Sequence, residues 1–377
     1  MTNQNKITLG IVTVLLCLGL ALWRRQELRP ARALPESPAN PAPSTGPVPV
    51  PSPVAPAPVQ SGPGPGTAAV AQRKFGDMDV SERNAILAQI EKMDLPAIFQ
   101  AMLDAGRVEQ DFRKQNSIQM ILAYALRGKS PSPEFLAQLR AFLEDHSNSA
   151  FERTVLVLGV LQEASTKESV NLLIEEAIHS PDNDMRRLAT GSIAGVNAGW
   201  GDGTYHEEIS PALERAWRES SDQGLLLSVA LAMVKAGAAS SIELLLDAAL
   251  APGGNDVVHQ RLALDVLNSK TVLNPHAIPP LVSRLANQPP TSPSSRLASH
   301  VLAQMNGVQP ATRALIDWLQ SADASAAPLA RDLVVHTRDP AMWQTALDPA
   351  VPFRSEENRE AIRAALAAYR AGRSLGR

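Results

Sequence analysis

The loop spanning residues 199–208, with the sequence GWGDGTYHEE, contains side chains that could do chemistry. Asp202, His206 and the two glutamates that follow could supply oxygen and nitrogen ligands to a divalent metal ion. The zinc-binding HExxH pattern is incomplete, because Ser210 stands where its second histidine belongs. A metal site is therefore one hypothesis for this loop.

The same loop contains two aromatic residues, Trp200 and Tyr205. Aromatic side chains exposed on a loop are typical anchors of protein–protein contacts. A partner-contact loop formed by Trp200, Asp202, Tyr205 and His206 is therefore the better of the two functional interpretations. The simplest interpretation is an ordinary connecting loop between units, in which the glutamates favour the start of the next helix.

Other candidate motifs are incomplete. The sequence RGKS at residues 127–130 looks like part of a phosphate-binding loop, but Ala123 replaces the required glycine and Pro131 breaks the helix that should follow. The remaining histidines are scattered without metal-ligand spacing, and no nucleophile elbow is present. We predict no catalytic residue, no cofactor and no small-molecule substrate.

A more regular pattern joins basic and acidic residues. Arginine recurs at the start of the second helix in successive predicted units, at Arg153, Arg187, Arg261, Arg296 and Arg331. An acidic residue often lies in the turn before that helix, as at Asp145, Asp182, Asp222, Asp256 and Asp323. These arginines could be structural or could form a basic stripe for an acidic partner.

The elements that carry this pattern are short amphipathic helices in pairs, predicted from Asp77 onward. The clearest unit, residues 168–199, places apolar residues at helical spacing on both sides of a break at Ser180-Pro181. Similar units begin at Pro133, Ser210, Ser240, Ala277 and Ala311, with weaker ones from Pro96 and Met342. Two such helices cannot bury their apolar faces alone, so neighbouring units must stack.

The turn aspartate followed by a helix-start arginine resembles HEAT repeats, within the armadillo-type solenoids, over about residues 96–370. The resemblance implies an all-α, right-handed α-α superhelix with the second helices on its concave face. It also implies a ladder of ion pairs between units, formed by Asp145, Arg153, Asp182, Arg187, Asp256, Arg261, Arg296, Asp323 and Arg331. The third unit lacks the arginine and the fifth has Ser292 in place of the acid, so the ladder should be interrupted there.

Composition agrees with a helical array. Aromatic residues make up only 4 % of the 377 residues, whereas helix-on-helix packing needs small and unbranched apolar residues. The formal net charge is −3, although the first 70 residues are net basic. The helical part is therefore acidic, which argues against a nucleic-acid partner. The single cysteine, Cys17, excludes a disulfide within the chain.

Residues 7–23, after a short tail of residues 1–6, are apolar and uncharged. They predict a transmembrane helix that is slightly short for a bilayer and acts as a signal anchor, with Trp23 and Arg24 at the headgroups. A cleaved signal peptide is the alternative. The arginines after this segment favour a cytoplasmic C-terminal part. The resemblance to bacterial signal anchors favours a periplasmic part at the inner membrane, which we expect.

Residues 24–75 predict a Pro-rich, disordered linker. Proline lacks an N–H group and fixes φ, so this linker should be extended polyproline II. A spacer is the simplest interpretation, and a ligand for a proline-recognition module is the alternative. The helical-repeat domain is expected over residues 76–372, followed by a short tail, 373–377.

The sequence therefore predicts a membrane-tethered, non-enzymatic scaffold that binds an unidentified protein partner through its helical surface. Two alternatives stay open. One is an enzyme on the same scaffold, as in helical-repeat chromophore lyases. The other is a self-assembling structural component of the cell envelope.

Overall fold

The computed structural model describes residues 74–196, 205–251, 256–269, 274–305, 308–337 and 339–374. By its internal contacts the chain divides into two units, Met1–Val70 and Ala71–Arg377, and every described residue belongs to the second. The predicted membrane segment, nearly all of the predicted linker and the end of the C-terminal tail lie outside the described residues. The described part is all-helical and contains no strand.

The helices alternate between two rows. The first members of the pairs are α3 (Leu95–Arg107), α5 (Pro133–Glu144), α7 (Lys167–His179), α9 (Tyr205–Glu219), α11 (Ala239–Leu250), α13 (Ile278–Asn287), α15 (Gln309–Ser321) and α17 (Pro340–Ala346). The second members are α4 (Phe112–Gly128), α6 (Ala150–Thr154), continued by the π-helix η2 (Val155–Gln162), α8 (Asn183–Gly195), α10 (Gln223–Ala236), α12 (Val257–Leu267), α14 (Pro293–Gln304), α16 (Ala327–Thr337) and α18 (Glu356–Ser374).

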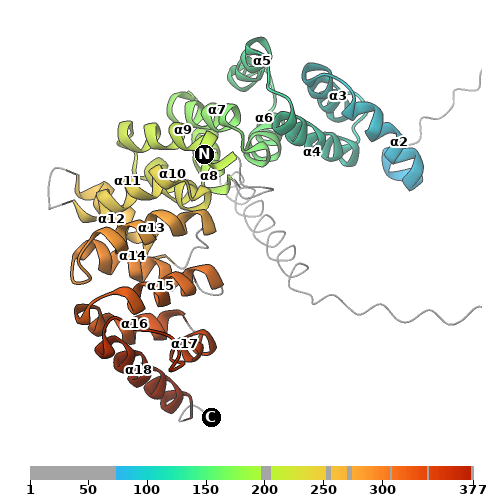
Figure 1. Cartoon of the computed structure of the whole chain (residues 1–377). Helices are drawn as coiled ribbons and strands as arrows, with labels where there is room; N and C mark the ends of the chain where they lie inside the picture. The colour runs from blue at the N-terminus through green and yellow to red at the C-terminus, as the bar shows by residue number, and fades with distance from the viewer. Residues whose placement is uncertain are drawn as a thin grey trace, which may run out of the picture. The chain divides into compact units, whose positions relative to one another are not determined.

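The remaining helices complete the order. They are η1 (Phe75–Asp77) and α2 (Val80–Glu91) at the start, with η3 (Pro275–Ala277) before α13 and η4 (Ala324–Ala326) before α16. The helices follow one another in chain order from α2 to α18 (Figure 1). The main contacts join members of a pair or nearest neighbours within a row, such as α7 with α9 and α8 with α10. No closed globule of sequence-distant segments is seen in the described part.

Most second helices begin at a residue that caps the free N–H groups of the first turn. Aspartate side chains accept these hydrogen bonds at Asp111, Asp182, Asp222 and Asp256, and Ser149 and Ser292 do so at α6 and α14. An N-cap of this kind contributes about 1 kcal/mol. Helix capping therefore explains three of the predicted acidic turn residues, Asp182, Asp222 and Asp256.

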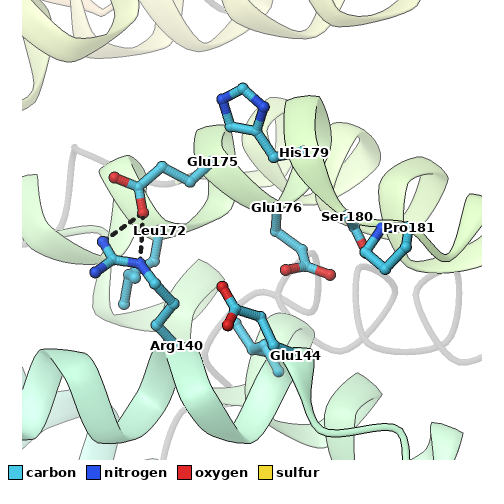
Figure 2. A pocket seen from close by; sticks show the side chains of 9 residues that line it. Arg140, Glu144, Leu172, Glu175, Glu176, His179, Ser180 and Pro181 are labelled. Atoms are coloured by element: carbon cyan, nitrogen blue, oxygen red, sulfur yellow. Dashed lines mark hydrogen bonds and ion pairs between the residues drawn. The ribbon is translucent and has the colours of Figure 1, made fainter.

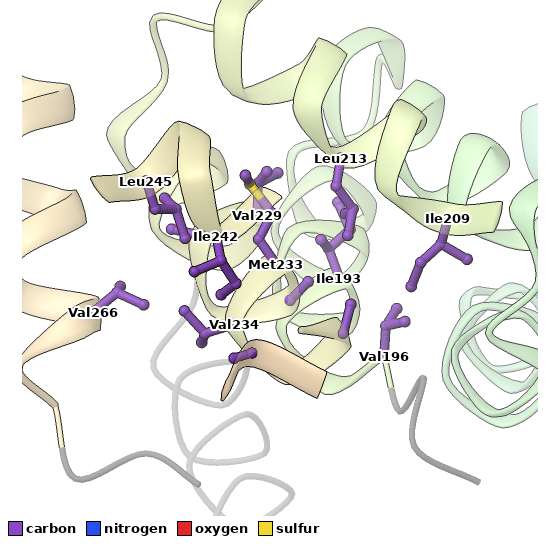
Figure 3. Close-up of a cluster of buried hydrophobic side chains, with 14 of the residues drawn as sticks. Ile193, Val196, Ile209, Leu213, Val229, Met233, Val234, Ile242, Leu245 and Val266 are labelled. Carbon is purple, nitrogen blue, oxygen red and sulfur yellow. The ribbon is translucent and has the colours of Figure 1, made fainter. Parts of the chain in front are cut away.

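The apolar core is continuous, and one part of it lies between α8 and α12. Ile193 of α8, Met233 of α10 and Ile242 of α11 are fully buried and lie together (Figure 3). Leu213 of α9 and Leu245 of α11 extend the same cluster. Each helix pair shares its apolar face with neighbouring pairs, as the sequence pattern predicted.

The helical unit includes Phe75, which the sequence assigned to the linker. Its side chain is buried, and its backbone N–H donates to the Asp111 carboxylate at 2.6 Å. Burial alone would raise the pKa of Asp111, but this bond and two others from the N–H groups of α4 lower it. The chain is thereby attached to the first turn of α4 immediately after the undescribed segment.

Candidate functional site: the groove between α5 and α7

The predicted contact loop lies mostly outside the described residues. Trp200 and Asp202 are not described, and the backbone of Tyr205 and His206 forms the start of α9. The sequence placed the next unit at Ser210, so the helix begins earlier than expected. Among the described residues, no group of three or more His, Cys, Asp or Glu side chains could hold a metal ion.

One of the predicted ion pairs joins successive units. The Arg153 guanidinium of α6 donates to the Asp182 carboxylate at 3.1 Å, and Arg153 is buried. Burial alone would raise the pKa of Asp182. Hydrogen bonds from the N–H groups of Asp184 and Met185, and then from Arg153, lower it below its ordinary value. This carboxylate both caps α8 and ties it to α6.

The other four arginines lie differently. Arg187 pairs with Asp184 and Arg261 approaches Asp265, in each case through exposed side chains of the same helix. The exposed side chains of Arg296 and Arg331 make no ion pair with the described residues. No repeated ladder therefore passes through the five arginines in the described part of the chain.

The other predicted acidic members bind locally. The Asp145 carboxylate accepts from Ser147, and Asp323 accepts from Ser325, which lowers the pKa of both carboxylates. Asp256 accepts from His259, with the same effect on its pKa. These residues shape turns and helix starts.

Polar contacts between units occur instead along the first helices. Arg140 of α5 donates to Glu175 of α7 at 3.0 Å through its Nε, and Arg215 of α9 donates to Asn171 of α7 at 3.0 Å. Arg284 of α13 pairs with both Glu243 and Asp247 of α11. The sequence does not reveal these pairs, because charged residues on a helix face are typical of a solvated surface.

Successive second helices are also joined at their C-terminal ends. The Arg127 guanidinium of α4 donates to the backbone oxygens of Glu163 and Ala164. The Lys235 ammonium of α10 donates to the backbone oxygen of Ala194 in α8. Terminal carbonyls of a helix have no partner within it, so these cations satisfy them.

An open groove of about 540 Å³ lies between α5 and α7. Its lining residues are Arg140, Leu143 and Glu144 of α5, followed by Leu172, Glu175, Glu176, His179, Ser180 and Pro181 of α7 and the turn after it. Figure 2 shows Glu144 and Glu176 directed toward each other across the groove. The Arg140–Glu175 pair lies on one side of them.

Glu176 is unusual among the groove residues. It is only 7 % exposed, and its buried Oε1 has no hydrogen-bond partner. A buried carboxylate without a partner is costly, because it has lost water and gained nothing in exchange. The Glu176 carboxylate beside the groove therefore lacks a hydrogen-bond donor or a positive charge from the described residues.

A second groove, of about 530 Å³, lies near the turn that follows α5. Phe112 of α4 and Phe151 of α6 are at its rim, 61 % and 56 % exposed. Their rings meet edge to face, with centroids 5.9 Å apart. The Arg107 guanidinium crosses the groove to the Glu152 carboxylate and donates to Asn148 at 2.6 Å.

Comparison of the sequence with protein-family models and with curated proteins finds no match. Function is therefore inferred from the geometry of the chain itself.

None of the described helices has the length and apolar character needed to cross a membrane. The predicted membrane segment, residues 7–23, lies outside the described part of the chain.

Proposed function

We propose that this chain is a HEAT-like, armadillo-type α-solenoid that acts as a scaffold and binds a protein partner. Its two rows of helices, each in contact with its neighbours along the chain, support the solenoid assignment. A right-handed superhelix and attachment to a bacterial inner membrane through residues 7–23 belong to the same proposal and derive from the sequence alone.

The observation that carries the proposal is the exposed aromatic pair. Phe112 and Phe151 hold an edge-to-face contact in open solvent, at the rim of a groove with an adjacent ion pair. Aromatic side chains beside an apolar and polar groove are common anchors at protein interfaces, because they bury much area at low entropic cost. A partner that covers both rings would remove this surface from water.

Site-specific photocrosslinking in the full-length chain tests the proposal. Benzoylphenylalanine replaces Phe151 in one variant and Val335, an exposed residue of α16, in the control. We expect a protein of defined mass to crosslink from position 151 and not from 335. The substitution Phe112→Ala should reduce the yield, because it removes the neighbouring anchor.

The same crosslinked proteins from both positions, or a yield unchanged by Phe112→Ala, would contradict a binding surface at this groove.

A further inference from the structure

The Arg140–Glu175 pair shows which charges in the α5–α7 groove are already compensated. The Arg140 guanidinium makes both of its bonds in the groove to one oxygen of Glu175. Glu144 and Glu176 form no ion pair with the described residues. Two carboxylates therefore face one another without a cation between them (Figure 2).

From this arrangement we propose that the groove binds a basic side chain, arginine or lysine, of the protein partner. The inference rests on the proposed scaffold function and specifies the chemistry of its partner. The cation would lie between Glu144 and Glu176 and compensate the charge of the Glu176 carboxylate, which no side chain of the described residues pairs with. Two carboxylates that face one another attract a positive charge more strongly than either would alone.

The walls of the groove fit the rest of such a side chain. Leu143 of α5 and Leu172 of α7 are buried residues that line it. Arginine and lysine have aliphatic stems that pack on apolar surface while the charged head reaches polar groups. The groove thus offers apolar contact for the stem and carboxylates for the head.

A bare metal ion is a poorer match. The described residues contain no set of three or more acidic or histidine side chains arranged as metal ligands. His179 lines the groove, but its ring points away from the two carboxylates in Figure 2. A guanidinium or ammonium group brings several N–H donors and needs only two carboxylates.

Ligand-observed saturation-transfer NMR on the purified full-length chain tests the proposal. The probes are acetyl-Gly-Arg-Gly-amide, its lysine analogue and its citrulline analogue, which is neutral but similar in shape to arginine. We expect saturable transfer to the arginine and lysine peptides and at least about tenfold weaker binding of the citrulline peptide, since one charge interaction is lost.

The variants Glu176→Gln and Glu144→Gln should each weaken binding of the arginine peptide about tenfold. Glu219→Gln, which removes an exposed glutamate at the end of α9, is the matched control and should leave it unchanged. The melting temperature of each variant shows whether the fold is retained, and Glu176→Gln should not lower it.

Equal binding of the citrulline peptide, or unchanged binding to Glu176→Gln, would overturn the proposal. Displacement of the arginine peptide by equimolar Mg²⁺ or Ca²⁺ would do so as well, because it would identify a metal site. A negative result here leaves crosslinking from position 151 unaffected, so failure of the basic-residue site is distinguishable from failure of the scaffold function.

Discussion

The α5–α7 junction and the core around α8 to α12 are both built from packed helices, but they differ in how completely the side chains between the helices are buried. In the core, Val229, Met233 and Ile242 are fully buried and contacted from several helices. At the junction, α5 contacts α7 beside an open groove, through a half-exposed ion pair. The first region therefore has side chains buried on all sides, whereas the second has an open groove with an unpaired glutamate oxygen.

The two regions also treat a buried glutamate differently. Glu214 of α9 accepts from the Ser241 hydroxyl at 3.1 Å and from the Arg218 guanidinium at 3.2 Å. Glu176 of α7 has a buried oxygen without a partner. A carboxylate oxygen without a partner costs stability that a paired one does not, and the proposed basic ligand would offset that cost.

The largest expected effect is the difference in stability loss between two leucine-to-alanine substitutions, one in the core and one beside the groove. Leu245→Ala should lower the free energy of unfolding by about 2–5 kcal/mol, because it leaves a cavity in dense packing. Leu172 is also buried, but it borders the open groove. Leu172→Ala should therefore cost only about 2 kcal/mol, because water from the groove can enter the space that the side chain leaves. Urea unfolding measures both, and equal losses would contradict the contrast between the regions.

The buried glutamates should respond with opposite sign. Glu214→Gln should lower the free energy of unfolding by about 1 kcal/mol, since it weakens two hydrogen bonds. Glu176→Gln should raise it by about 1 kcal/mol, since it removes an unpaired buried charge. The measurement is again urea unfolding, and a loss of stability in Glu176→Gln would mean that this carboxylate has a structural role.

The ion pair between Arg153 of α6 and Asp182, which caps α8, should make the stability of the chain depend on pH. Asp182→Asn keeps the cap of α8 but loses the ion pair with Arg153, and should cost about 1 kcal/mol at pH 7. The pKa of Asp182 is lowered in the folded state. Its stabilisation is therefore present above the unfolded-state pKa and is lost as the pH falls through the folded-state value.

Thermal melts of both proteins from pH 7 to pH 3 measure this effect. The two stability curves should begin to converge below about pH 4, the pKa of an aspartate in the unfolded chain, and should meet only below the lower folded-state pKa of Asp182. Parallel curves would show that the charge of Asp182 contributes nothing.

Two glycines of the second helices differ in the space around them: one is closely packed and the other is open to solvent. A Cβ at Gly159 would lie 2.1 Å from the side-chain carbonyl carbon of Gln119, whereas a Cβ at Gly191 would meet nothing within 4 Å. Gly191→Ala should therefore stabilise by about 0.5–1 kcal/mol, through helix propensity alone. Gly159→Ala should give no gain unless Gln119→Ala is added, as melting temperatures would show.

The smallest effect is expected for the exposed pair at the junction. A double-mutant cycle on Arg140 and Glu175 should give a coupling of about 0.5 kcal/mol or less, which salt removes. The cycle on Arg284 and Glu243, which are less exposed and belong to a three-member cluster, should give more. A larger coupling at the junction would mean that the ion pair holds α5 in place.

The sequence predicted the helix pairs because the break at Ser180-Pro181 and the apolar spacing around it are local signals. It also located Asp182 in the turn, and one of its predicted ion pairs is present, with Arg153. Sequence spacing alone could not show whether each arginine reaches the next unit, because the direction of a long arginine side chain depends on its tertiary neighbours. Arg187 and Arg261 find acids within their own helices instead.

The groove was not predicted, although part of its signal is visible. Glu176 follows Leu172 and Leu173 by four and three residues, so it lies on the same helix face as two buried leucines. That position indicates a buried glutamate. The partner helix α5 and its Glu144 could not be inferred, because the depth of a groove between two units depends on how they stack.

The bonds from Arg127 and Lys235 are made to main-chain oxygens of the neighbouring helix. A main-chain oxygen is present whichever amino acid occupies the position. Each such contact therefore tolerates substitution of the accepting residue. The sequences of neighbouring units can change while the hydrogen bond between the units is kept.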